Sequence, residues 1–133
     1  MTYRIINPEE LGVPSGWNHG MLAPAEGRLL FVAGQTARDA SGEVTASGFV
    51  EQFERSLAAA LAVVREAGGG PEHIGRLNLY VTDLEAYLSS RKDLGAVYRR
   101  LMGKHFPAMV LLEVNGLADE GAVVEIEATA VVP

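Results

Sequence analysis

The sequence predicts an α+β fold in which a mixed β-sheet carries two helices on one face. Apolar side chains recur at helical spacing over residues 49–67 and again over residues 84–102, which predicts the two helices. Apolar and β-branched runs of strand length precede, separate and follow these segments, which predicts the sheet. The order is ββ(β)αβαββ, and right-handed crossovers place both helices on the same side of the sheet.

The amino-terminal strands are expected to be short. Residues 3–6 form the first and end at Asn7-Pro8, and a second is expected within residues 17–23. Residues 28–34, RLLFVAG, form a compact apolar strand. Ala25-Glu26-Gly27 just before it predicts a hairpin turn between the second and third strands.

The two helices have recognisable ends. Ser47 is placed to cap the first, and Gly68-Gly69-Gly70-Pro71 stops it. The second is expected from Leu84 to Met102, with Asp83 as its cap and Gly103 at its end. The apolar stripe of the first helix consists of Phe49, Phe53, Leu57, Ala60, Leu61 and Val64. That of the second consists of Leu84, Tyr87, Leu88, Leu94, Tyr98 and Leu101.

The carboxyl-terminal segment, residues 105–133, contains two strand-like runs separated by a glycine-containing loop, which predicts two strands joined by a turn. In the last run, period-two alternation puts Glu125 and Glu127 on the same face. Two interpretations are open. The face is solvated and the glutamates are surface charges, or the face is buried by another subunit and one glutamate lines a pocket.

The sheet face opposite the helices is expected to be half apolar. Its expected apolar members are Tyr80, Met109, Leu111, Val123 and Val131. An apolar face with no helix over it predicts burial between subunits of an oligomer.

Composition limits the function classes. The 133 residues predict a single domain, residues 1–133. The absence of cysteine excludes disulfides, thiol catalysis and zinc–thiolate sites, and agrees with a cytoplasmic location. The net charge of -6 argues against nucleic-acid binding, and no apolar run reaches the roughly 18 residues of a membrane span. The three histidines are isolated, so no metal site is expected, and no cofactor motif is present.

Several segments together resemble the Rid family (YjgF/YER057c/UK114, also called endoribonuclease L-PSP). These are Gly34-Gln35, Ser41-Gly42-Glu43, residues 81–84, Phe106-Pro107-Ala108 and residues 124–128, in the same order and almost from end to end. The resemblance implies a chorismate-mutase-like fold. It also implies a homotrimer whose open sheet faces pack into a central barrel, with ligand-binding clefts between subunits.

The resemblance also implies a site. Archetypal members hydrolyse reactive enamines and imines, such as 2-aminoacrylate, to keto acids and ammonia without a cofactor. Glu125 corresponds to the carboxylate that activates water, Trp17 to an aromatic wall and Gly34 to a backbone position in the pocket. The arginine that binds the substrate carboxylate is replaced by Met109, and the pocket cysteine by Leu111. Methionine supplies no charge and no hydrogen-bond donor.

Three functions are compatible with this resemblance. In the first, the protein binds or hydrolyses an imine that is uncharged or anchored differently. In the second, it is a genuine deaminase in which Arg38, Lys92 or His19 replaces the lost cation. In the third, it is a ribonuclease or translation inhibitor, as some relatives are described; the acidic balance and the lack of a catalytic histidine pair argue against this. A cation close to Met109 would distinguish the first two.

Overall fold

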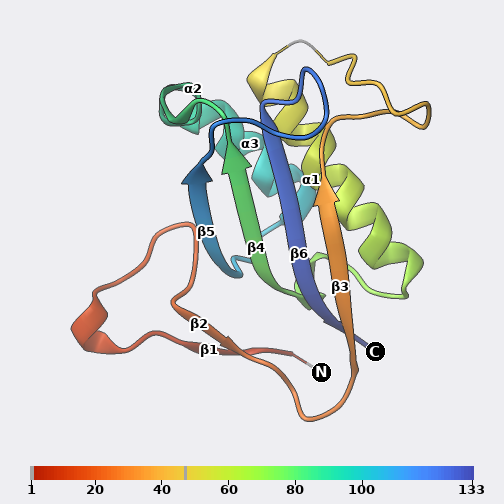
Figure 1. Ribbon diagram of the computed structural model, residues 1–133. Helices are drawn as coiled ribbons and strands as arrows, with labels where there is room; N and C mark the ends of the chain where they lie inside the picture. The colour runs from red at the N-terminus through yellow and green to blue at the C-terminus, as the bar shows by residue number, and fades with distance from the viewer. Residues whose placement is uncertain (1, 47) are drawn as a thin grey trace.

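The computed structural model describes residues 2–46 and 48–133 and has the predicted α+β architecture. Four strands form one sheet in the order β3-β6-β4-β5 (Figure 1). Strands β4 and β5 are parallel and the other pairs are antiparallel, so the sheet is mixed as expected. The four strands are β3 (Arg28–Gln35), β4 (Ile74–Val81), β5 (Ala108–Glu113) and β6 (Val124–Val132).

The described residues form three α-helices where two helices were expected. Helix α1 spans Phe49–Glu66, and the predicted second helix is divided at Ser90 into α2 (Leu84–Ser89) and α3 (Arg91–Met102). Helices α1 and α3 lie behind the sheet in Figure 1 and leave its front face open. The predicted cap Asp83 is confirmed, since its carboxylate accepts a hydrogen bond from the Ala86 amide at 3.2 Å. The predicted cap Ser47 lies outside the described residues.

The core lies between α1, α3 and the sheet. The predicted alternation of β6 is confirmed, because every second residue from Val124 to Val132 is buried and those between are half-exposed. The largest fully buried side chains of this core include Leu57, Leu61, Ile74, Leu77 and Ile126. Buried Gln52 of α1 ties the start of β6 to this helix, because its side chain accepts a hydrogen bond from the Val123 amide at 2.9 Å.

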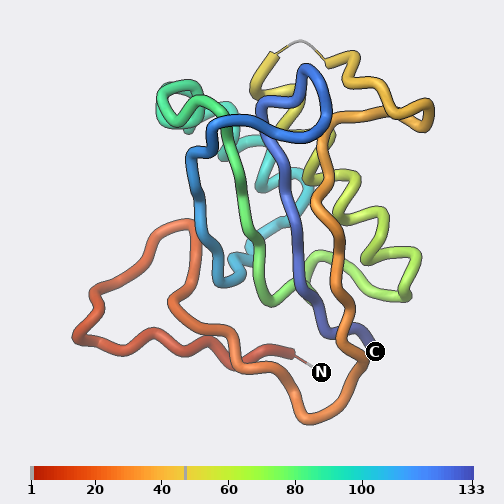
Figure 2. Tube along the Cα trace, viewed as in Figure 1, coloured from red at the N-terminus to blue at the C-terminus, as the bar shows by residue number. Residues whose placement is uncertain are grey.

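The amino-terminal strands form a sheet of their own. Strands β1 (Arg4–Ile6) and β2 (Gly20–Leu22) pair with each other and cross the foot of the main sheet, close to both chain ends (Figure 2). The expected hairpin between β2 and β3 is therefore wrong. Turn residues indicate where the chain reverses direction, but they do not determine which strands pair with each other. Tyr3 fastens this small sheet, since its hydroxyl donates to the His73 carbonyl at 2.7 Å and accepts from the Val131 amide at 3.1 Å.

The last two predicted strands are present and are joined by a loop, but they do not pair with each other. Strand β5 is the edge of the sheet next to β4, whereas β6 lies between β3 and β4. The connecting segment passes across the end of β4, where Val114 donates to the Val81 carbonyl at 2.8 Å and Thr82 donates to the Val123 carbonyl at 3.1 Å. Strand β6 is buried along one whole face and lies inside the sheet, where it pairs with a neighbouring strand on each side.

The sequence predicts Met109 and Leu111 on the open face of the sheet. This prediction is wrong, because both residues lie on the helix-facing side. In the parallel pairing of β5 with β4, Met109 is opposite Leu77 and Leu111 is opposite Leu79. Both leucines are buried beneath the helices, and Met109 and Leu111 pack against the same core. The open face remains half apolar through other residues. Its apolar members are Leu29, Phe31, Tyr80, Val110, Leu112 and Val131.

Candidate functional site

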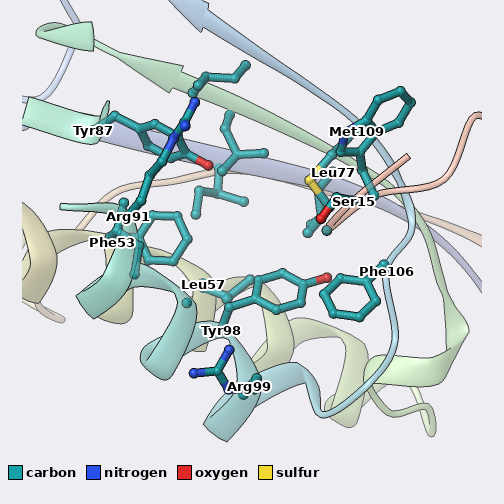
Figure 3. A pocket seen from close by; sticks show the side chains of 17 residues that line it. Ser15, Phe53, Leu57, Leu77, Tyr87, Arg91, Tyr98, Arg99, Phe106 and Met109 are labelled. Carbon is teal, nitrogen blue, oxygen red and sulfur yellow. The ribbon is translucent and has the colours of Figure 1, made fainter. Parts of the chain in front are cut away.

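A cleft of about 790 Å³ lies between the helix-facing side of the sheet and the helices (Figure 3). Met109 and Leu111 of β5 form part of the sheet wall, and Tyr87 of α2 and Tyr98 of α3 form part of the helix wall. Residues 15–17 of the loop before β2 complete the lining. The cleft thus contains three residues predicted for the site, namely Trp17, Met109 and Leu111.

Aromatic contacts hold the walls of the cleft. The rings of Tyr98 and Phe106 are stacked, with centroids 5.3 Å apart and planes inclined by 7°. The Tyr98 hydroxyl donates to the His105 carbonyl at 2.6 Å, and burial raises the pKa of this phenol. Trp17 meets the ring of His19 edge-on at 4.6 Å. These contacts give the cleft a rigid, largely apolar lining.

Asn18 holds the loop that carries Trp17 against the end of the sheet. Its side-chain amide donates to the Phe106 carbonyl at 2.6 Å, and its backbone amide donates to the Pro107 carbonyl at 3.3 Å. The loop is thereby joined to the segment that leads into β5. This explains how Trp17, far from β5 in the sequence, shares a cleft with Met109.

The other two predicted residues, Gly34 and Glu125, lie together on the open face. A Cβ atom at position 34 would stand 2.9 Å from the carboxyl carbon of Glu125, so the carboxyl group lies directly against the Gly34 backbone. Burial, then the charge of Asp119 and then that of Glu127, raise the pKa of Glu125 above its ordinary value. A carboxyl group with a raised pKa is suited to exchanging protons near neutral pH.

Asp119 is itself held in place. It accepts a hydrogen bond from Thr36 at 2.5 Å and lies 3.8 Å from the guanidinium of Arg38. Arg38, one of the cations considered as a substitute for the missing arginine, therefore belongs to the surroundings of Glu125. It does not line the cleft that contains Met109.

The neighbouring carboxylate, Glu127, has a different role. It accepts hydrogen bonds from the Tyr80 hydroxyl at 2.5 Å and from the Asn78 amide at 2.8 Å. These two bonds hold the pKa of Glu127 below its ordinary value, so it is a fixed anion. Glu125 accepts no hydrogen bond from the described residues, so of the two carboxylates it is the one without a fixed partner there.

The cleft is also lined by two arginines that were not expected from the sequence. Arg91 and Arg99 of α3 contribute to its lining, whereas Lys92 does not, and His19 contacts Trp17 without lining the cleft. A signal for Arg91 was present in the sequence. It lies four residues after Tyr87 and seven before Tyr98, on the helical face already marked by the apolar stripe.

The described residues contain neither a metal-binding cluster nor a membrane-spanning helix. Residues 2–46 and 48–133 hold no group of three or more side chains suited to binding a metal ion. None of their helices combines the length and the apolar character needed to cross a bilayer.

The sheet with its helix layer and edge cleft places the chain in the class of YjgF-like α+β proteins. The model of the endoribonuclease L-PSP family matches residues 10–132. A RutC family protein of Pyrococcus abyssi is 30% identical over 105 residues, which are 78% of this chain and 79% of that protein. The chain therefore belongs to the endoribonuclease L-PSP family, which is the Rid or YjgF/YER057c/UK114 family.

Solved structures show the same architecture. The Rid family protein YyfB of Yersinia pestis, described as of unknown function, superposes with a TM-score of 0.85 at 31% identity, covering 99% of this chain and 100% of that one. The YjgF gene product of E. coli superposes with a TM-score of 0.69 at 25% identity, covering 94% and 92%.

Proposed function

We propose that the protein is a homotrimer that binds and hydrolyses a small imine or enamine in clefts between its subunits. The observation that carries this proposal is the separation of the predicted site into two groups. Met109 and Leu111 face the helices, whereas Glu125 lies on the open face of the same sheet. The two groups are on opposite sides of the sheet, so a second copy of the chain is needed to bring Glu125 to a cleft.

The open face is suited to such an assembly. Phe31 is 74% exposed and Leu112 is 46% exposed in the single chain, at opposite edges of the sheet. Large exposed apolar side chains spread over one face mark an interaction surface. Packing the face against a second copy removes them from water and brings Glu125, from the centre of the sheet, into an interface.

The chemistry follows from the two groups. Glu125 accepts a proton from water as the water oxygen forms a bond to the imine carbon. The resulting carbinolamine loses its nitrogen as ammonia when the C–N bond breaks and the nitrogen takes up a proton, which leaves a carbonyl product. An enamine first gains a proton on carbon to become the imine. The apolar walls formed by Trp17, Tyr98 and Leu111 hold the organic part of the substrate and limit bulk water.

A ribonuclease activity is not proposed. The net charge of -6 disfavours contact with a phosphate backbone. Tag-free protein incubated with single-stranded RNA is expected to leave it intact. Cleavage that survives repurification and disappears in Glu125→Ala would contradict this.

The decisive experiment is complementation between two inactive variants. Glu125→Ala removes the proposed base, and Leu111→Trp fills the cleft. If each site combines the cleft of one subunit with Glu125 of another, random mixed trimers contain intact sites and regain roughly a quarter of wild-type activity. If both groups act within one chain, mixing restores nothing.

Two measurements come before this test, namely the mass of the assembly and its rate of imine hydrolysis. Light scattering is expected to give three times the chain mass of 14.2 kDa. Hydrolysis is measured with an amino-acid oxidase that supplies imines in situ. A monomer, or Glu125→Ala with wild-type turnover, would overturn the proposal.

A further inference from the structure

We propose that Arg91 anchors the carboxylate of an amphipathic ligand whose aromatic or long aliphatic body fills the cleft. The inference rests on the function proposed above, because it concerns the substrate of the same cleft. It identifies a cation other than those considered from the sequence. It also identifies a class of substrate, namely imines and enamines of aromatic or long aliphatic α-amino acids, with the corresponding α-keto acids as products.

The charge of the cleft differs from that of the chain. Two of the described residues that line it are arginines, Arg91 and Arg99, and none is aspartate or glutamate. The chain as a whole has a net charge of -6. Both arginines are exposed to solvent, and they give the cleft a local positive charge that attracts anions.

Arg91 is available to a ligand. Its side chain forms no salt bridge and no hydrogen bond with the described residues, whereas Arg55 pairs with Glu51 and Arg100 pairs with Glu54. Arg91 follows Ser90, where α2 ends and α3 begins, so the dipoles of the two helices act on it in opposite directions. An exposed arginine that lines a cleft and has no partner among the described residues is available to bind an anionic ligand.

The positions of the side chains set the form of the ligand. Figure 3 shows Arg91 beside Tyr87 on one side of the cleft, Met109 on the other, and the ring of Tyr98 between them. A carboxylate at Arg91 therefore directs the rest of the ligand along the Tyr98 ring toward the Met109 sulfur. Aromatic and thioether surfaces of this kind bind aromatic or aliphatic groups well.

The size of the cleft favours a larger ligand than 2-aminoacrylate. Its volume of about 790 Å³ lies within the range of roughly 300–1,000 Å³ found for pockets that enclose drug-sized molecules. A three-carbon acid at Arg91 would leave most of the apolar wall in contact with water. A guanidinium binds a carboxylate through two parallel hydrogen bonds, so Arg91 fixes the orientation of the ligand as well as its charge.

The test is calorimetric titration of the intact protein with three probes. Phenylpyruvate has the carboxylate and the aromatic body, phenylacetone has only the aromatic body, and pyruvate has the keto acid without it. Wild-type protein is expected to bind phenylpyruvate more tightly than either of the other two. Arg91→Gln is expected to weaken phenylpyruvate binding roughly 10- to 100-fold and to leave phenylacetone binding unchanged.

Two further variants act as controls. Arg91→Lys keeps the charge but loses the bidentate contact, so binding is expected to be intermediate. Arg65→Gln removes an exposed arginine of α1 that does not line the cleft, so binding is expected to equal that of wild type. In turnover, Arg91→Gln is expected to raise KM with little change in kcat.

The outcomes separate this inference from the proposed function. Phenylpyruvate binding that is absent, insensitive to Arg91→Gln, or no tighter than pyruvate binding overturns the inference, even if Glu125-dependent hydrolysis is found. Binding that depends on Arg91 supports the inference. It does so even if Glu125→Ala leaves hydrolysis unchanged and the proposed catalysis fails.

Discussion

Gly34 lies against the carboxyl group of Glu125, and a Cβ atom on residue 34 would stand 2.9 Å from its carboxyl carbon. Gly34 is not among the glycines with positive φ, so the position requires space and not backbone freedom. The conformation of the Glu125 side chain therefore exists only while residue 34 has no side chain. This relationship connects a glycine at the end of β3 to the proposed base on β6.

Gly34→Ala is expected to displace the Glu125 carboxylate while the fold is retained. Misplacing a catalytic group by about 1 Å costs up to roughly 100-fold in rate, so kcat for imine hydrolysis should fall tenfold or more. Gly116→Ala is the matched control, since a Cβ there meets open space. Steady-state kinetics and circular dichroism measure the two effects. Wild-type kcat in Gly34→Ala would mean that hydrolysis does not depend on this position of Glu125.

Glu125 and Glu127 should change stability with pH in opposite directions. The raised pKa of Glu125 means that folding favours its protonated form, so its contribution is present below the ordinary pKa and is lost as pH rises through the folded pKa. The lowered pKa of Glu127 means that its contribution is present above the ordinary pKa and is lost as pH falls through the folded value. At pH 7, Glu125→Gln should therefore raise Tm and Glu127→Gln should lower it.

Thermal unfolding at pH 7 and pH 4, at one fixed protein concentration, measures these shifts. The fixed concentration matters because an assembly makes Tm depend on it. Glu66→Gln, on the exposed end of α1, controls for removing one negative charge from an acidic chain. Shifts of the same sign in Glu125→Gln and Glu127→Gln at pH 7 would contradict the different surroundings described for them.

Much of the fold was predictable because it depends on local patterns. The α1 stripe and the alternation of β6 were predicted correctly, since burial on one face imposes a period that the residues display. Strand neighbours were not predictable in this way. Turn residues before β3 indicated a hairpin and those before β6 a turn between two strands, yet both segments connect strands that do not pair with each other. Pairing depends on where each strand is buried in the whole sheet.

The positions of the site residues were also only partly predictable from the sequence. Strand β5 reads AMVLLE, with apolar residues on both faces, so alternation could not decide whether Met109 or Val110 faces the helices. The register with β4 decides it, and register is a tertiary property. Arg91 was missed for a related reason. Its helical spacing from Tyr87 and Tyr98 is visible in the sequence, but an apolar stripe predicts burial, and charged residues are seldom buried.

Phe31→Glu is expected to dissociate the proposed trimer without unfolding the chain. Phe31 is 74% exposed on the open face, so a charge there costs little in the monomer but is unfavourable in a packed interface. Light scattering should show loss of the trimer, and hydrolysis should be lost with it. Ala62→Glu places the same charge on exposed α1 and should change neither. A trimeric, active Phe31→Glu protein would show that the open face is not the interface.

Met109→Arg is expected to shift substrate preference toward small anions. The family resemblance implies that Met109 corresponds to the substrate-binding arginine of archetypal members, and Met109 lies across the cleft from Arg91 (Figure 3). A three-carbon substrate held at Arg91 leaves the apolar walls unused, so turnover of 2-aminoacrylate by the wild type should be below that of arginine-bearing relatives. A guanidinium at position 109 supplies a second charged hydrogen-bond donor, and kcat/KM for 2-aminoacrylate should rise roughly 10- to 100-fold.

The same change should lower kcat/KM for the imine of phenylalanine, because the substitution puts a charge on the apolar wall that would contact the ring. A coupled assay that generates each substrate in situ measures both values. Met109→Leu keeps volume and polarity, so its preference should equal that of wild type. The gain should vanish when Glu125→Ala is added, since anchoring without the base does not activate water. No gain from Met109→Arg, with Met109→Leu fully active, would mean that small anions are oriented by groups other than those at position 109.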